Sequence, residues 1–225
     1  MGMRRIGIAP SMMCADFINL GKELDLMKAE GADCLHVDIM DGHYVPNYTL
    51  GPDFCRRLAE YSPLPLDIHL MIENIDAHAP LFAKLPGARV SFHPEATWHP
   101  LRTIDLIRSC GAQAGIAVDP ALPLSAVEDM LPHVSLVCIM TVNPGYAGQA
   151  LIPEALDKLR ALADLVHDRG LEIQVEVDGN VSWENIPRMV KAGADLLVAG
   201  TSSLFDGKGD LRTNLRRMRA AIGRD

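Results

Sequence analysis

Short apolar runs with strand character alternate with segments of helical periodicity, and this alternation limits the chain to very few folds. The predicted strands span residues 6–9, 34–39, 66–71, 90–92, 113–118, 136–140, 172–177 and 196–199. The predicted helices lie near residues 17–29, 52–60, 75–84, 100–109, 124–130, 153–168, 183–191 and 210–222. Because each intervening helix returns the chain to the starting edge of the sheet, the strands are expected to be parallel.

Eight strand–helix units within 225 residues predict a closed (β/α)₈ TIM barrel, with residues 1–225 forming a single catalytic domain. Three predicted helices end in a Gly-Ala pair, at 31–32, 111–112 and 193–194, where glycine suits a left-handed helix stop. The alternative is an open flavodoxin-like or Rossmann-like sheet. It is disfavoured because no G-x-G-x-x-G motif follows the first predicted strand.

The charge balance excludes some classes of partner. The formal net charge is −8 and the pI is about 5.4, so neither nucleic acid nor an anionic membrane is expected as a partner.

Five cysteines form no C-x-x-C pair, which argues against a disulfide framework and a thiolate zinc site. No apolar run approaches the length of a membrane span. A cytoplasmic enzyme is therefore expected.

Residues 34–43 place polar side chains inside an otherwise apolar strand. Successive side chains alternate between faces, so His36, Asp38 and Met40 share one face of this strand. A buried imidazole and a buried carboxylate are costly unless a partner compensates them, and a divalent cation is one such partner. The alternative is a hydrogen-bonded core histidine beside a surface aspartate. His69 and Asp178, near the ends of two further strands, supply additional possible ligands.

In a barrel, functional side chains gather where strands end and loops begin. The polar residues at the predicted strand ends are Ser11, His36, Asp38, His69, His93, Asp119, residues 143–148, Asp178 and residues 200–201. Among them, His36, Asp38, His69 and Asp178 form a two-histidine, two-carboxylate set. Such a set predicts one divalent metal ion, and Zn²⁺, Fe²⁺, Mn²⁺ and Co²⁺ all remain open.

Two carboxylates from strands two and seven could flank a substrate from opposite sides. Asp38 and Asp178 could then alternate as general base and general acid, removing a proton on one face and returning it on the other. Proton removal beside a carbonyl leaves an enediolate, whose developing charge a metal stabilises. The alternative for each aspartate is a purely structural ligand role.

Three turns supply exposed backbone amides that suit a phosphate group. The candidate residues are Gly145, Tyr146, Ala147, Gly148, Asp178, Gly179, Asn180, Gly200 and Thr201, although such glycines also serve as ordinary tight turns. Methionines near strand ends, namely Met12, Met40, Met71 and Met140, are candidates for an apolar wall or for core filling. Asp67 and Glu176 are expected one layer deeper as a buried carboxylate pair, and His43 is expected to be exposed.

Several motifs together resemble the ribulose-phosphate 3-epimerase family over essentially the whole chain. They are Ala9-Pro10-Ser11, residues 36–42 (HVDIMDG), Val45-Pro46-Asn47, residues 67–71 (DIHLM), His93-Pro94-Glu95-Ala96, residues 140–145 (MTVNPG), residues 176–179 (EVDG) and residues 192–195 (AGAD). The resemblance implies a ribulose-phosphate-binding TIM barrel that inverts C3 of a ketose phosphate. D-Ribulose 5-phosphate and D-xylulose 5-phosphate would be interconverted.

Carried over by position, the resemblance implies specific roles. His36, Asp38, His69 and Asp178 would hold the metal, with Asp38 as proton acceptor and Asp178 as proton donor. Ser11 and His69 would contact the substrate, and the phosphate would lie against residues 145–148, 178–180 and 200–201. The expected partner is a small-molecule ketose phosphate. Because barrels of this size commonly assemble, a homo-oligomer is also expected.

Some residues depart from the commonest pentose pattern of the family. These are Cys14, Tyr146-Ala147, Asn180 and Thr201-Ser202, which are similar to the allulose-6-phosphate 3-epimerase branch. Asn143 and residues 93–96 instead match the pentose enzymes. The hexulose phosphate is therefore kept as an alternative substrate. A related decarboxylase is disfavoured because Met40 stands where a charged residue would be needed, and a non-catalytic phosphosugar-binding barrel is a further alternative.

Overall fold

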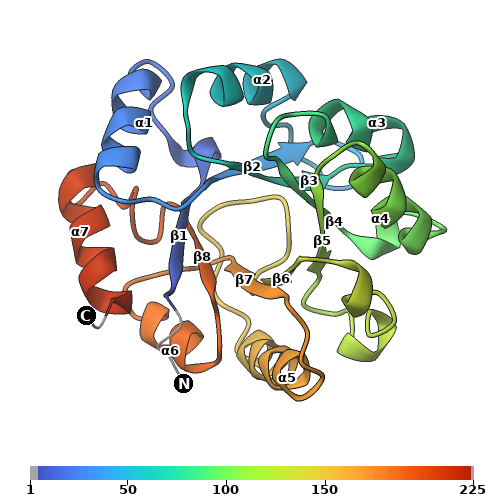
Figure 1. Ribbon diagram of the computed structural model, residues 1–225. Coiled ribbons are helices and arrows are strands. Elements are labelled where there is room, and N and C mark those ends of the chain that lie inside the picture. Colours follow the sequence, from blue (N-terminus) through green and yellow to red (C-terminus); the bar gives the residue numbers. More distant parts are fainter. Residues whose placement is uncertain (1–4, 224–225) are drawn as a thin grey trace.

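The computed structural model describes residues 5–223, in which parallel strands surround a central axis and helices lie outside them (Figure 1). The strands are β1 Gly7–Pro10, β2 Leu35–Met40, β3 Leu66–Met71, β4 Arg89–Phe92, β5 Gln113–Val118, β6 Leu136–Met140, β7 Gln174–Asp178 and β8 Leu196–Ala199. Their spatial order is β1-β8-β7-β6-β5-β4-β3-β2, so the strands from β2 to β8 pair with their sequence neighbours and β8 pairs with β1. An eight-stranded parallel barrel is therefore confirmed.

The barrel closes between β1 and β2, where the two strands share a single parallel bridge, Ser11 to His36. Below it, the amide of Asp33 donates to the Ile8 carbonyl at 2.9 Å. The seam therefore lies directly beside a residue that the sequence marks as a metal ligand.

The helices of the described residues are α1 Leu20–Ala29, α2 Pro52–Tyr61, α3 Ile75–Ala83, α4 Pro100–Ser109, α5 Glu154–Asp168, α6 Ile186–Lys191 and α7 Leu211–Ile222. Gly31, Gly111 and Gly193 follow three of them with φ of +81°, +99° and +100°, as the Gly-Ala pairs predict. Within residues 5–223, every helix is too short or too polar to cross a membrane.

The helix predicted near residues 124–130 is wrong. This segment forms successive tight turns, with 3₁₀ helices at Leu124–Ala126 and Leu131–His133. Its bonds run from each amide to the carbonyl three residues earlier, as from Met130 to Val127 at 2.9 Å. Pro120, Pro123 and Pro132 bracket the segment and leave no room for several uninterrupted α-helical turns.

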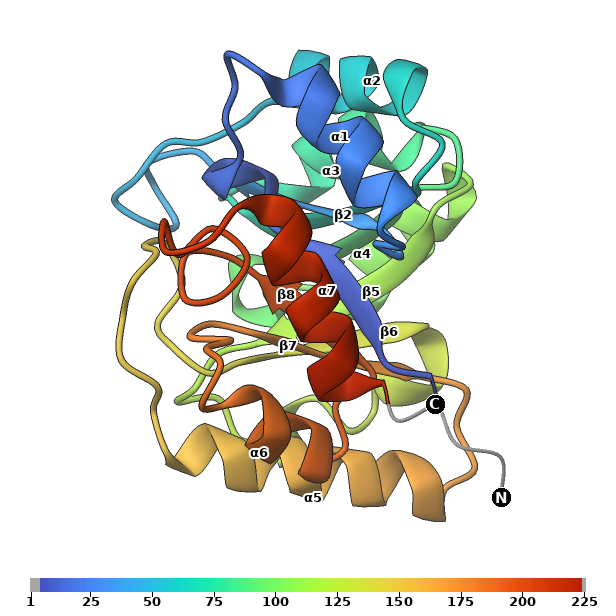
Figure 2. The same cartoon turned by 90° about the vertical axis from the view of Figure 1, so that its left-hand side faces the viewer.

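The alternating pattern of β2 separates two environments. Leu35, Val37 and Ile39 join the apolar core between strands and helices. His36 and Asp38 are also buried but lie on the opposite face, inside the barrel. The loops that follow β2, β6 and β8 gather at one end of the molecule, which makes that end the mouth of the barrel (Figure 2).

Candidate active site

The four predicted ligand residues meet at the mouth of the barrel. His36 and Asp38 come from β2, His69 from β3, and Asp178 from the last position of β7. Each offers one ligand atom, and these atoms all lie within 4.8 Å of one another. Asp38 Oδ1 lies 3.3 Å from His36 Nε2 and 3.4 Å from His69 Nδ1, while Asp178 Oδ2 lies 3.9 Å and 3.8 Å from the same nitrogens.

The donor set fits a divalent cation. Both imidazoles are fully buried, and Nδ1 of His69 has no hydrogen-bond partner although it faces the two carboxylates. A buried nitrogen without a partner is costly, and a cation between these groups would satisfy it. Two nitrogen and two oxygen donors suit Zn²⁺, Fe²⁺, Mn²⁺ or Co²⁺. The cluster is therefore able to bind a metal ion.

The two carboxyl groups differ in their affinity for a proton. Burial and the negative charge of Asp38 raise the pKa of Asp178 to about 6. Burial opposes ionisation of Asp38 too, but His36 and His69 lower its pKa well below the ordinary value. Asp38 is therefore ionised at neutral pH, whereas Asp178 takes up a proton more readily. A bound cation would lower the pKa of both groups.

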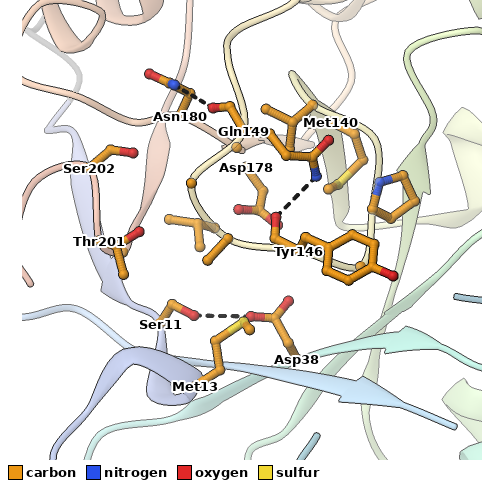
Figure 3. A pocket seen from close by; sticks show the side chains of 18 of the residues that line it. Ser11, Met13, Asp38, Met140, Tyr146, Gln149, Asp178, Asn180, Thr201 and Ser202 are labelled. Atoms are coloured by element: carbon orange, nitrogen blue, oxygen red, sulfur yellow. Dashed lines mark hydrogen bonds between the residues drawn. The ribbon is translucent and has the colours of Figure 1, made fainter. Parts of the chain in front are cut away.

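A cavity of about 570 Å³, including its open mouth, lies over Asp38 and Asp178 (Figure 3). Most of the predicted substrate-binding residues line it, namely Ser11, Gly145, Tyr146, Ala147, Gly148, Asp178, Gly179, Asn180, Gly200 and Thr201. Met40, Met71 and Met140 also line it, as predicted for an apolar wall. The cavity thus combines an apolar wall with a few polar groups, as small-ligand sites commonly do.

Met12 and His69 do not line the cavity. Met12 is fully buried in the core, and Met13 lines the cavity in its place. The 3₁₀ turn Met12–Cys14 after β1 decides which methionine faces the cavity, and the sequence gives no signal for the phase of that turn. His69 does not line the cavity and lies buried beside Asp38, so its contact with substrate stays a prediction.

The loop between β6 and α5 is held over the cavity from both sides. On one side, Asn47 Nδ2 donates to the Gly145 carbonyl at 2.8 Å, and Tyr146 Oη donates to the Pro46 carbonyl at 3.1 Å. On the other side, Asn180 Nδ2 donates to the Gln149 carbonyl at 2.5 Å (Figure 3). The sequence analysis missed Gln149 as a lining residue, because its contacts depend on the fold of this loop.

Backbone groups rather than cationic side chains surround the outer part of the cavity. Among the described lining residues, none is Lys or Arg. Gly179 and Asn180 both have positive φ, of +104° and +44°, which turns the chain sharply at the end of β7. This arrangement favours amide donors as the ligands of an anionic group.

Gly179→Ala should destabilise the protein more than Gly111→Ala. Both glycines have φ near +100°, so both substitutions carry the same left-handed strain of about 1–2 kcal/mol. A Cβ at Gly179 would also approach the Val142 amide nitrogen to 2.9 Å and its Cγ2 to 2.6 Å, whereas at Gly111 nothing lies within 4 Å. We expect an additional loss of about 1–3 kcal/mol for Gly179→Ala.

Thermal unfolding measures this difference, which corresponds to a gap in Tm of roughly 2–10 °C. Equal Tm values for the two variants would show that the close approach of Gly179 to Val142 costs nothing.

Comparison with known proteins agrees with this geometry. Residues 7–205 match the model of the ribulose-phosphate 3-epimerase family. Ribulose-phosphate 3-epimerase 1 of Cupriavidus necator is 46% identical, covering 97% of this chain and 93% of its own. Ribulose-phosphate 3-epimerase of Escherichia coli K12 is 41% identical, covering 99% and 98%.

A solved structure shares the fold at much lower identity. The tryptophan synthase A-subunit of Pyrococcus furiosus superposes with a TM-score of 0.69 at 15% identity, covering 96% of this chain and 98% of its own. That likeness concerns the barrel alone. The family match and the two bacterial relatives span nearly the whole chain, and this chain therefore belongs to the ribulose-phosphate 3-epimerase family.

Proposed function

We propose that this chain interconverts D-ribulose 5-phosphate and D-xylulose 5-phosphate by inverting the configuration at C3. The observation that carries the proposal is the pair Asp38 and Asp178, which contact the same two histidines from different strands at the floor of one cavity. The names of the bacterial relatives support the pentose substrate.

The reaction needs one proton removed and one returned. Ionised Asp38 takes the C3 proton, and the electron pair of that C–H bond forms a C2–C3 double bond while negative charge moves to the C2 oxygen. Asp178 then delivers a proton to the opposite face of C3, and the electron pair returns from the enediolate. In the reverse direction the two carboxyl groups exchange roles.

The residues around Asp38 suit this role. Ser11 Oγ donates to Asp38 Oδ2 at 3.0 Å, which orients the carboxylate toward the cavity (Figure 3). His36, Asp38, His69 and Asp178 would hold one divalent cation, which supplies positive charge beside the developing enediolate. Zinc, iron, manganese and cobalt remain the candidate metals.

The resemblance to the family supports the assignment of Asp38 as the first base and of Asp178 as the proton donor. General acid–base groups of this kind contribute about 10²–10⁴-fold each to the rate.

Ribulose 5-phosphate should be a better substrate than allulose 6-phosphate, with kcat/KM larger by about tenfold or more. The test is parallel turnover in D₂O, following the epimer and C3 deuterium by NMR. The Asp38→Asn variant serves as the blank for uncatalysed exchange. Faster exchange of allulose 6-phosphate would assign the chain to the hexulose reaction, which Tyr146 and Asn180 in the cavity wall keep as the second candidate.

We also propose that residues 1–225 form one catalytic domain. The protein would act in the cytoplasm and as a homo-oligomer. Its partner would be a small ketose phosphate, with neither nucleic acid nor a membrane as a partner. The non-catalytic alternative would require that neither epimer exchange its C3 proton.

A further inference from the structure

His36 contacts an ion pair that Asp67 and Arg89 form inside the barrel. Its Nδ1 lies 2.7 Å from Asp67 Oδ2, and both side chains are buried inside the barrel. The other oxygen of Asp67 accepts from Arg89 Nε at 2.9 Å, and Arg89 also donates to Gln174. An ionised carboxylate only accepts hydrogen bonds, so the proton of His36 lies on Nδ1. His36 Nε2 lies 3.3 Å from Asp38 Oδ1, and a cation bound between the two would take the place of a proton on Nε2, so that the Nε2 lone pair faces the cation.

His69 has a different partner. Its Nε2 lies 3.0 Å from Nε2 of His93, and both imidazoles are fully buried. Two ring nitrogens at this distance require one donor and one acceptor. A cation between Nδ1 of His69 and the two carboxylates needs the lone pair of Nδ1, so the ring proton then belongs on Nε2. His93 then accepts on Nε2 and carries its own proton on Nδ1.

The surroundings of His93 agree with this arrangement. Its Nδ1 faces Glu95 Oε1 at 3.5 Å, and the same oxygen accepts from Tyr44 Oη at 3.0 Å. The Tyr44 and His93 rings lie 4.9 Å apart between centroids. Nδ1 of His93 makes no hydrogen bond within the described residues, so the Glu95 carboxylate and the Tyr44 ring only flank the imidazole.

We propose that Asp67 and His93 are positioning residues that hold the two ligand histidines in opposite tautomers, with Nδ1–H on His36 and Nε2–H on His69. Neither residue lines the cavity, so each acts through the histidine that it contacts. The inference rests on the proposed cation site. It predicts that His36 binds the cation through Nε2 and His69 through Nδ1.

A competing assignment makes Asp67 a ligand itself. His36, Asp67 and Glu176 also offer ligand atoms within 4.8 Å of one another, and both oxygens of Glu176 lack a hydrogen-bond partner. The guanidinium of Arg89 already neutralises Asp67, which favours the positioning role. A second cation in this group would double the metal content of the protein.

The decisive measurement is a long-range ¹H–¹⁵N correlation spectrum of the zinc-loaded protein labelled with ¹⁵N-histidine. We expect one zinc-bound histidine protonated at Nδ1 and one protonated at Nε2, assigned by the signals that move in Asp67 and His93 variants. Two zinc-bound histidines in the same tautomer would overturn the proposal. Two zinc ions per chain would also overturn it, because Asp67 would then be a ligand.

Zinc affinity tests the same roles by competition with a chromophoric chelator. His93→Phe removes the acceptor of the His69 proton and Asp67→Leu removes the acceptor of the His36 proton, and each should weaken zinc binding by about 10–100-fold. His93→Gln keeps an acceptor oxygen and should largely restore affinity. Ser91→Ala is the matched control, because Ser91 pairs with His69 in the strand register but makes no hydrogen bond through its buried hydroxyl.

Wild-type zinc affinity in both His93→Phe and Asp67→Leu would contradict the proposal. If either variant fails to fold, the histidine tautomers measured in the wild-type protein still test the proposal. A protein that binds zinc in the expected tautomers yet turns over neither epimer would retain this inference and refute the proposed function. A protein that binds none of zinc, iron, manganese and cobalt would refute the inference and the cation site together.

Discussion

Asp178→Asn should lower kcat for conversion of ribulose 5-phosphate by about 10²–10⁴-fold, because the group that returns the proton is lost. The same variant should still exchange the C3 proton of ribulose 5-phosphate with D₂O, since Asp38 and the two histidines remain in place. Asp38→Asn should likewise lose turnover, but it should still exchange the C3 proton of xylulose 5-phosphate with D₂O. NMR of both substrates in D₂O measures turnover and exchange together.

Asp119→Asn is the matched control for these variants. Asp119 also follows a strand of the barrel, but its carboxylate accepts from the Ala121 amide at 2.7 Å and lies outside the ligand cluster. Its kcat should stay within a few-fold of the parent enzyme. Near-full turnover by either Asp38→Asn or Asp178→Asn would refute the two-aspartate scheme.

Removal of the cation should abolish epimerisation and lower thermal stability. Without a cation, Asp38 and Asp178 face a common space, and the buried Nδ1 of His69 stays without a partner. A ligand that binds only the folded state stabilises it by about 2.7 kcal/mol when its free concentration is 100 times Kd. Chelation should therefore lower Tm by roughly 5–10 °C, and one equivalent of metal should restore Tm and turnover.

Matched histidine variants separate this effect from unspecific action of the chelator. His36→Ala should show little change in Tm on chelation, because the site is already disrupted. His78→Ala, on the exposed face of α3, should respond as the parent enzyme does. Full turnover by enzyme shown to be free of metal would remove the cation from the proposed reaction.

Some features of the site follow directly from the local sequence. The period-two alternation in residues 34–40 places His36 and Asp38 together on the inner face of β2, while Leu35 and Val37 face the helices. Eight strand–helix units predict a parallel barrel, and parallel strands end at one rim. Two local rules therefore suffice to bring His36, Asp38, His69 and Asp178 to the same mouth.

These two rules do not predict how prolines interrupt a helix or which residue of a short turn is buried. The segment near residues 124–130 has helical periodicity, yet the prolines around it leave only tight turns. Likewise, one 3₁₀ turn sends Met12 into the core and Met13 to the cavity. A shift of one residue in this turn would exchange the buried methionine and the cavity-lining methionine. The periodicity of the sequence does not determine that shift.

The sequence by itself determined the barrel, the family of this protein and the gathering of His36, Asp38, His69 and Asp178 at one mouth. Only the tertiary structure decided which nitrogen of each histidine faces the cluster, through contacts of His36 with Asp67 and of His69 with His93. The physical reason is that strand alternation depends on neighbouring residues alone. Hydrogen bonds between strands depend instead on register and side-chain rotamers, which are fixed when the whole barrel closes.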